Sequence, residues 1–265
     1  MPFPSEGFPL AAAVSPRVQA VETTDSTNAD LVRHVSEAPD QWPHLSLMLT
    51  NDQRKGRGRL DRSWTAPAGT ALAVSVVVDA SAVPPSSRGW IPLIAGAAMT
   101  RAIAAQTQSA GHSARLKWPN DVLIDGGKIC GILAEVVPGH PDSIVVGAGV
   151  NTRMGRTDLP VDTASSFLTL GLEADEDRLL ADYLSALDEQ LQALAASGGD
   201  AAASGVLGEI EALCITLGHE VVVSLPVGDP LAGHAQRIDV DGRLVVIDAL
   251  GVEHAVSAGD VEHVR

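Results

Sequence analysis

The sequence has few of the features that mark a disulfide-stabilised or membrane-spanning protein. Cys130 and Cys214 are its only cysteines, and two thiols far apart in apolar surroundings are typical of reduced core residues. No apolar run reaches the length that crosses a membrane. The N-terminal segment is interrupted by prolines and has no basic stretch of the kind found in signal peptides. We therefore expect a cytoplasmic protein with no membrane partner.

Positive charge is also scarce. The chain has 18 Lys and Arg residues against 33 Asp and Glu residues, which gives a formal net charge of −15. This balance argues against a general nucleic-acid binder, which usually carries net positive charge, although it leaves room for a local basic site. No helix-turn-helix pattern precedes the first predicted strand, because only about sixteen residues precede it. We expect no DNA partner.

Several signatures of specific chemistry are absent too. There is no G-x-x-x-x-G-K-[ST] phosphate loop and no G-x-S-x-G nucleophile motif. The eight histidines are scattered without metal-ligand spacing, so no side-chain metal cluster is expected. The 265 residues are 45% hydrophobic and 19% charged, which is typical of a globular chain with one sizeable core and an appendage.

Against this acidic background, the segment 50–64 (T-N-D-Q-R-K-G-R-G-R-L-D-R-S-W) concentrates cations. Glycines alternate with them, and Trp64 closes the segment. Clustered cations repel one another unless an anion lies between them, and glycines let backbone N–H groups approach such an anion. Closure over a small phosphorylated or carboxylated molecule is one interpretation; a solvated basic turn and a nucleic-acid patch are the alternatives. The five cations of the segment are Arg54, Lys55, Arg57, Arg59 and Arg62.

Hydrophobic spacing and turn residues predict the order of the elements. The residues before 17 form a loose arm. Strands are expected at 17–22, 45–49, 71–78, 129–137 and 143–150, and helices after 25–28 and at 89–108, 173–196 and 202–217. The basic segment thus lies between two strands of one sheet. From His219 onward, short strands separated by glycine turns predict a small all-β barrel. The expected domains are a flexible arm at 1–16, a main domain at 17–217 and the barrel at 218–265.

Three further motifs carry polar groups whose role the spacing leaves open. Ser26, Thr27 and Asn28 either cap a helix or use its free N–H groups to hold a ligand. Lys128 opens a strand after the hairpin turn 125–127, and without other information solvent is its favoured environment. The G-A-G-V-N sequence at 147–151 is either a backbone wall against a flat ligand or a tightly packed strand end.

Taken together, these motifs resemble the biotin protein ligase family. They occur in family order: S-T-N at 26–28, Q-x-x-G-R-G-R at 53–59 with Trp64 following, K-W-P-N-D at 117–121, G-K-x-x-G-I-L-x-E at 127–135 and G-x-G-V-N at 147–151. The missing N-terminal DNA-binding domain makes the chain similar to the monofunctional class. The resemblance implies an α+β fold: a catalytic domain related to class II aminoacyl-tRNA synthetases, with a mixed sheet and flanking helices, and a C-terminal SH3-like barrel.

The resemblance also implies the reaction. Such ligases join biotin to ATP to form biotinyl-5′-AMP, with Mg²⁺ bound largely through the phosphates. They then transfer biotin to a lysine of a biotin carboxyl carrier domain of an acyl-CoA or pyruvate carboxylase, releasing AMP. No general base for this second step is identified in the sequence. The nearest enzyme rival is a lipoate ligase, and the rival of another class is a nucleic-acid or regulatory binding module built on the basic loop.

Residue roles follow from the resemblance alone. Lys128 and Arg59 resemble the catalytic cations that bridge biotin's carboxylate and the α-phosphate. The residues implied to bind biotin are Ser26, Thr27, Asn28, Gln53, Gly56, Arg57, Gly58, Arg59, Lys128, Gly131 and Gly149. Those implied to bind ATP are Arg59, Arg62, Trp64, Lys117, Asn120, Asp121 and Asn151. Asp61 stands where the family more often has glycine, which puts a negative charge beside Arg59 and Arg62. That charge either weakens the attraction for phosphate or pairs with an arginine in the open state of the loop.

Overall fold

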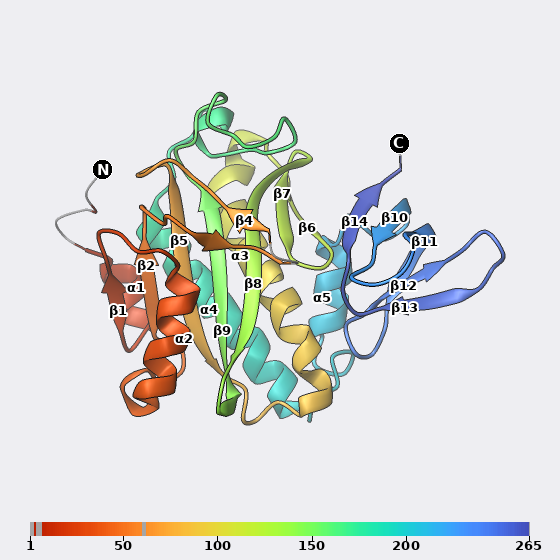
Figure 1. The fold of residues 1–265 in the computed structure, drawn as a ribbon, viewed down its shortest axis with the longest axis horizontal. Coiled ribbons are helices and arrows are strands. Elements are labelled where there is room, and N and C mark those ends of the chain that lie inside the picture. Colours follow the sequence, from red (N-terminus) through yellow and green to blue (C-terminus); the bar gives the residue numbers. More distant parts are fainter. Residues whose placement is uncertain (1–2, 4–6, 60–61, 265) are drawn as a thin grey trace.

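The computed structural model describes residues 3, 7–59 and 62–264, and its centre is a seven-stranded mixed sheet (Figure 1). The strand order is β1-β2-β5-β9-β8-β7-β6. β1 pairs parallel with β2, and the other neighbours are antiparallel. In sheet order the strands are β1 (Val18–Ala20), β2 (Leu47–Thr50), β5 (Ala71–Asp79), β9 (His140–Asn151), β8 (Gly127–Val137), β7 (Asp121–Ile124) and β6 (Ala114–Lys117).

Helices cover both faces of this sheet, which explains why its central strands are apolar on both sides. In β5, Val74 and Val76 join the core beneath α3 (Ile91–Thr107) and α4 (Glu176–Ala196). Val77 of the same strand packs with α2 (Thr27–Glu37) on the opposite face. Alternate side chains of a strand point to opposite faces, so a β-branched run such as A-L-A-V-S-V-V-V is buried throughout. Of the expected helices, only α5 (Val206–Leu213) is much shorter than predicted.

The N-terminal residues differ from the loose arm that the sequence predicts. Residues Pro9–Val14 form helix α1, which packs against α4. Phe8 and Ala11 are buried, and the backbone N–H groups of Leu10 and Ala11 donate to the Asp177 carboxylate at 2.9 Å each. A carboxylate at the free N–H groups of a helix start is favourable. The arm prediction is therefore wrong for residues 9–14, because it missed this long-range partner.

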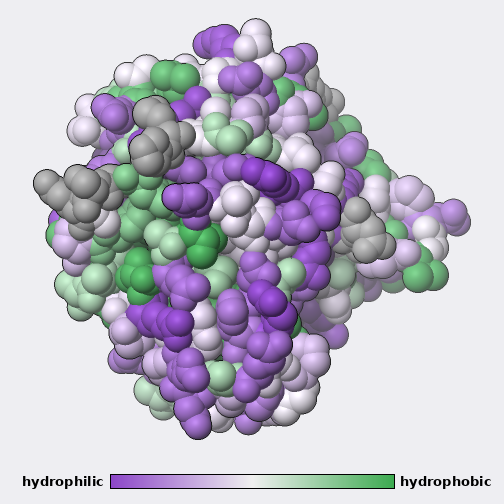
Figure 2. Space-filling view, turned by 60° about the vertical axis from the view of Figure 1, so that its left-hand side comes forward, coloured by the Kyte–Doolittle hydropathy of each residue, from purple (hydrophilic) through white to green (hydrophobic). Residues whose placement is uncertain are grey.

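The C-terminal region forms a five-stranded antiparallel sheet in the order β13-β12-β11-β10-β14. It protrudes from the side of the larger domain (Figure 2). Four of its strands follow the predicted short runs, whereas the last strand, β14, was not predicted. The strands are β10 (Glu220–Ser224), β11 (Leu231–Ile238), β12 (Leu244–Ile247), β13 (Glu253–Val256) and β14 (Asp260–His263). The mixed sheet with flanking helices and the small β-domain confirm the predicted fold class.

Two buried tryptophans attach the C-terminal domain to the larger domain. Trp90 Nε1 donates to the carbonyl of Val240 at 2.9 Å, and Trp118 Nε1 donates to the carbonyl of Gly242 at 3.2 Å. An indole N–H that is buried with its ring needs such an acceptor. The β11–β12 turn is therefore fixed against residues 89–93 and the 118–120 turn.

No described helix is long and apolar enough to cross a membrane.

Candidate active site

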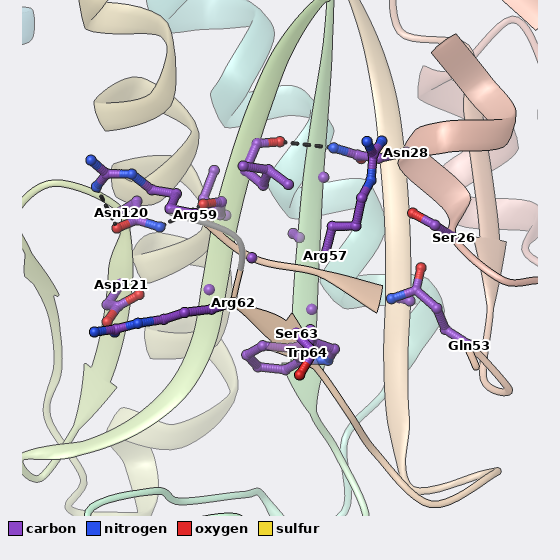
Figure 3. A pocket seen from close by; sticks show the side chains of 18 of the residues that line it. Ser26, Asn28, Gln53, Arg57, Arg59, Arg62, Ser63, Trp64, Asn120 and Asp121 are labelled. Atoms are coloured by element: carbon purple, nitrogen blue, oxygen red, sulfur yellow. Dashed lines mark hydrogen bonds between the residues drawn. The ribbon is translucent and has the colours of Figure 1, made fainter. Parts of the chain in front are cut away.

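A pocket with about 850 Å³ of space, open to solvent, lies on the face of the sheet where β5, β8 and β9 meet the start of α2 (Figure 3). A small hairpin covers it, formed by β3 (Gly56–Arg57) and β4 (Ser63–Trp64) from the basic segment. The hairpin arises between β2 and β5, as the sequence predicts. Most of the predicted site residues line this pocket: Ser26, Thr27, Asn28, Gln53, Arg57, Gly58, Arg59, Arg62, Trp64, Asn120, Asp121, Lys128, Gly131 and Gly149.

One end of the pocket holds a network of uncharged polar side chains. Gln53 Oε1 accepts a hydrogen bond from the backbone N–H of Thr27 at 2.9 Å, and the Thr27 hydroxyl oxygen lies 3.2 Å from the same atom. Asn28 Nδ2 donates to the carbonyl of Leu133 at 3.1 Å. The Ser26 hydroxyl accepts from the N–H of Ala29, so this residue both caps α2 and lines the pocket. The two interpretations of the S-T-N motif are therefore compatible.

Ser75, which the sequence analysis did not identify, supports this network from beneath. It is completely buried on β5, and its Oγ lies 2.8 Å from Thr27 Oγ1 and 2.5 Å from Asn28 Oδ1. One hydroxyl proton cannot serve both contacts, so Ser75 donates to the Asn28 carbonyl and accepts from Thr27. The only sequence signal for Ser75 is a hydroxyl in an otherwise apolar strand.

The cations of the pocket are each held by a partner. Lys128 Nζ lies 2.7 Å from Asp121 Oδ1, and Arg59 Nη1 donates to Asn120 Oδ1 at 3.0 Å. Arg57 pairs with Glu135 at 2.9 Å. The carboxylates of Asp121 and Glu135 offset part of the repulsion between these like charges. Lys128 lines the pocket, contrary to the interpretation that it faces only solvent.

The C-terminal domain also contributes to the pocket. Gly259 and Asp260 line it, and Asp260 pairs with Arg62 at 2.6 Å. Burial lowers the pKa of Arg59 from its ordinary value, while the nearby carboxylates of Asp121 and Asp260 oppose that effect. Four cations, Arg57, Arg59, Arg62 and Lys128, face two carboxylates among the described lining residues. The pocket therefore favours anionic ligands.

The glycines of the pocket wall are required by neighbouring side chains. A Cβ on Gly149 would lie 2.5 Å from the Trp64 ring, and one on Gly131 would lie 3.3 Å from it. A Cβ on Gly147 would collide with the Asn28 amide. The wall is thus a flat surface on which Trp64 rests. Lys128 Nζ lies 5.8 Å from the centre of the indole.

Three predicted residues do not line the pocket. Gly56 pairs with Trp64 in the hairpin, where a Cβ would meet the Trp64 carbonyl. Lys117 lies near His263, whose pKa is lowered by burial and then by Lys117. Asn151 is buried at the end of β9 and donates to the carbonyl of Ser165 at 2.9 Å. Asp61 falls outside the described residues.

Two acidic residues at the site were not predicted. Glu135 accepts from both Asn28 and Arg57, and so joins the polar network to the basic hairpin. Its position in the G-K-x-x-G-I-L-x-E motif was the available signal. Asp260 lies in a strand that the sequence did not predict, far along the chain from the other residues, and no local pattern marks it.

In the part of the chain that is described, no three His, Cys, Asp or Glu residues gather into a metal site.

Comparisons with known proteins identify the class. Residues 20–151 match the biotin/lipoate A/B protein ligase family. The biotin–[acetyl-CoA-carboxylase] ligase of Mycobacterium tuberculosis is 36% identical over 250 residues, which are 94% of this chain and 90% of that protein. The chain therefore belongs to the biotin/lipoate A/B protein ligase family. The bifunctional ligase/repressor of Escherichia coli is 30% identical over 62% of this chain and 50% of its own length.

Within that family, the Mycobacterium relative that matches nearly the whole chain is named a biotin–[acetyl-CoA-carboxylase] ligase, and similar solved structures share the fold. The Aquifex aeolicus biotin protein ligase in complex with biotin and ATP superposes with a TM-score of 0.72. It is 22% identical, and the match covers 94% of this chain and 99% of that one. The Leishmania major biotin protein ligase in complex with biotinyl-5-AMP has a TM-score of 0.59 and 23% identity, over 92% of this chain and 99% of that one.

Proposed function

We propose that this protein is an ATP-dependent biotin protein ligase. It activates biotin as biotinyl-5′-AMP and transfers the biotinyl group to a specific lysine of a biotin carboxyl carrier domain, releasing AMP. The acceptor is a carrier domain of an acyl-CoA or pyruvate carboxylase. The observation that carries the proposal is one pocket that combines a network of uncharged polar side chains with four cations. The full-length similarity to a biotin–[acetyl-CoA-carboxylase] ligase supports it.

The first step joins two anions. A biotin carboxylate oxygen attacks the α-phosphorus of ATP, the new C–O–P linkage forms, and pyrophosphate leaves with the bonding electrons. Bringing a carboxylate against a phosphate requires cations that neutralise both and hold the attack geometry. Asp121 fixes the end of Lys128, and the adjacent Asn120 fixes the end of Arg59. Lys128 and Arg59 supply that charge.

The two substrates occupy different ends of the pocket. The neutral bicyclic ring of biotin lies at the end lined by Ser26, Thr27, Asn28 and Gln53, which offers donors and acceptors without net charge. The nucleotide lies at the end lined by Arg62, Trp64, Asn120 and Asp121. Figure 3 shows Ser26, Asn28 and Gln53 on one side of the basic hairpin and Asn120 and Asp121 on the other. ATP enters as its magnesium complex, with the ion bound through phosphate oxygens.

The test is pyrophosphate exchange into ATP, with biotin and lipoate supplied in separate reactions. Both acids are tested because the family includes enzymes for each of them. We expect exchange with biotin and none with lipoate. Exchange with lipoate alone would assign the chain to the other branch. No exchange with either acid, from folded protein with Mg²⁺ present, would contradict an adenylating function.

A further inference from the structure

The backbone of Lys128 is held by a loop segment that lies outside the pocket lining. β8 begins at Gly127, but its first pair with β9 is at Cys130. Before that pair, a segment of the loop that follows β9 lies beside β8 instead, with a parallel bridge between Lys128 and Ala164. We call residues 163–166 the strap, and none of its four residues lines the pocket.

Both backbone polar groups of Lys128 bond to the strap. The Lys128 N–H donates to the Thr163 carbonyl at 2.8 Å, and the Lys128 carbonyl accepts from the Ser165 N–H at 2.8 Å. At the other end of the lysine, Nζ lies 2.7 Å from Asp121. The strap therefore fixes the start of the side chain, and Asp121 fixes its charged end.

The strap is itself anchored at the end of β9. The buried Asn151 side chain donates from Nδ2 to the Ser165 carbonyl at 2.9 Å. Ser166 is completely buried, and its hydroxyl donates to the Met154 carbonyl at 2.7 Å. The next residue, Phe167, is completely buried and donates its N–H to the Asn151 carbonyl at 3.2 Å. A buried segment that is bonded in this way is a firm support for the lysine.

Gly127 allows the strap to approach this closely. A Cβ on Gly127 would lie 2.8 Å from Ser165 Cβ and 3.5 Å from the Ser165 backbone nitrogen. Carbon atoms that are not bonded to each other pack about 3.5–4.0 Å apart. An alanine at 127 would therefore push the strap away and stretch the hydrogen bond from Ser165 to Lys128. Gly127 is not part of the pocket lining, so it is the strap that requires the missing side chain.

We infer that the strap positions the Lys128 amine for adenylate formation, an inference that rests on the proposed function. The amine has to lie between two anions, and its charge is effective only where charge develops in the transition state. A displacement of about 1 Å can cost about 100-fold in rate. Thr163, Ala164 and Ser165 are thus positioning residues, which act through Lys128 and not on a substrate.

The experiment displaces the strap from outside the pocket. Gly127→Ala should lower the kcat of biotin-dependent pyrophosphate exchange by at least about tenfold, because Lys128 no longer meets the developing charge. The KM for ATP should stay within about twofold, since the interactions lost are those of the transition state. Biotin binding measured by calorimetry should keep the stoichiometry of the unmodified enzyme, which shows that the folded fraction is unchanged.

Ser165→Gly provides a rescue. It removes the Cβ that an alanine at 127 would meet and keeps the backbone bonds to Lys128. The Gly127→Ala/Ser165→Gly double variant should therefore recover kcat to within about threefold of Ser165→Gly alone. Ser166→Ala loosens the strap at its anchored end and should lower kcat by about threefold on its own. The control is Gly208→Ala, which should leave kcat unchanged because Gly208 is exposed on α5 with open space around it.

Unchanged kcat in Gly127→Ala and Ser166→Ala would overturn the inference. A fall in kcat that Ser165→Gly does not restore would also overturn it, because the cause would then lie outside the contact with the strap. A KM for ATP that rises by the same factor as kcat falls would assign the effect to nucleotide binding. If Gly127→Ala loses biotin-binding stoichiometry, the kcat of Ser166→Ala decides. Failure of the unmodified enzyme to catalyse exchange would instead contradict the proposed function itself.

Discussion

At the scale of single residues, the site depends on side chains that are held by specific neighbours. Lys128 is paired with Asp121, and the Thr27–Asn28 pair is held by a buried hydroxyl. A long flexible side chain loses entropy when it is fixed, and a nearby partner fixes it before the substrate arrives. The role of each residue is therefore tested by substituting it and, as a control, by making the same substitution at a residue of the same type outside the pocket.

For Lys128→Ala, we expect pyrophosphate exchange to fall to background, because the charge between the carboxylate and the α-phosphate is removed. Stability should change by only about 0.2–1 kcal/mol, the usual range for a partly exposed ion pair. The control is Lys55→Ala, since Lys55 lies in the same basic segment but pairs with Asp25 outside the pocket lining. Near-normal exchange in Lys128→Ala would remove this residue from the mechanism.

For Ser75→Ala, we expect the KM for biotin to rise about tenfold while the KM for ATP stays unchanged. The substitution leaves the buried Asn28 carbonyl without its donor, which costs about 1–3 kcal/mol, and 1.4 kcal/mol corresponds to a factor of ten. Ser46→Ala is the matched control, because the buried Ser46 Oγ has no hydrogen-bond partner among the described residues. An unchanged KM for biotin in Ser75→Ala would show that the network does not position the substrate.

At the scale of elements, the basic hairpin is the part of the site with the least internal support. The pairs Gly56–Trp64 and Arg57–Ser63 join β3 to β4, and the Gly58 N–H donates to the Arg62 carbonyl at 2.6 Å beyond them. Side chains of the hairpin also contact Glu135, Asn120 and Asp260, and such partly exposed contacts are weak in water. An anionic ligand would add several charge-assisted hydrogen bonds to the same cations.

Biotin and ATP together should therefore slow amide hydrogen exchange across residues 53–64 by at least about tenfold relative to the free enzyme, because local opening then requires the loss of ligand contacts. Mass spectrometry of peptides that cover this segment measures the effect. The exposed turn 226–230 of the C-terminal domain is the internal control and should exchange at the same rate in both states. Equal rates at 53–64 would exclude ligand-driven ordering of the hairpin.

At the scale of the whole molecule, the C-terminal domain completes the active site as well as packing against it. Asp260 reaches Arg62 across the domain boundary, and the turn at Gly242 is fixed by Trp118. The site is thus assembled from residues that are almost two hundred positions apart, because β14 lies at the edge of its sheet facing the pocket.

Asp260→Asn should lower the KM for ATP by about two- to fivefold. The carboxylate occupies Arg62 and repels a triphosphate, and at a partly exposed position this amounts to about 1 kcal/mol. Glu262→Gln makes the same charge change on the same strand, at an exposed position outside the pocket lining, and should leave the KM unchanged. A higher KM for ATP in Asp260→Asn would mean that Asp260 supports nucleotide binding.

The sequence predicted those parts of the fold that local patterns encode. The β-branched run at 71–78, the basic segment between two strands and the hairpin turn at 125–127 all form as expected. Ordered motifs also identified most of the residues that line the pocket, because these motifs fall on the start of α2, the hairpin, β8 and β9, which the sheet brings together. Turn chemistry and side-chain alternation depend on near neighbours in the chain, so they can be read without coordinates.

Long-range contacts decided the rest. Helix α1 forms because Asp177 receives its first N–H groups, and β14 forms because β10 offers it an edge. Ser75, Glu135 and Asp260 acquire their roles only where distant strands bring them beside Asn28, Arg57 and Arg62. The sequence by itself determined the class of enzyme and the ligand-facing motifs. Only tertiary packing decided which side chains hold those motifs in place, because the partners that fix them are far apart along the chain.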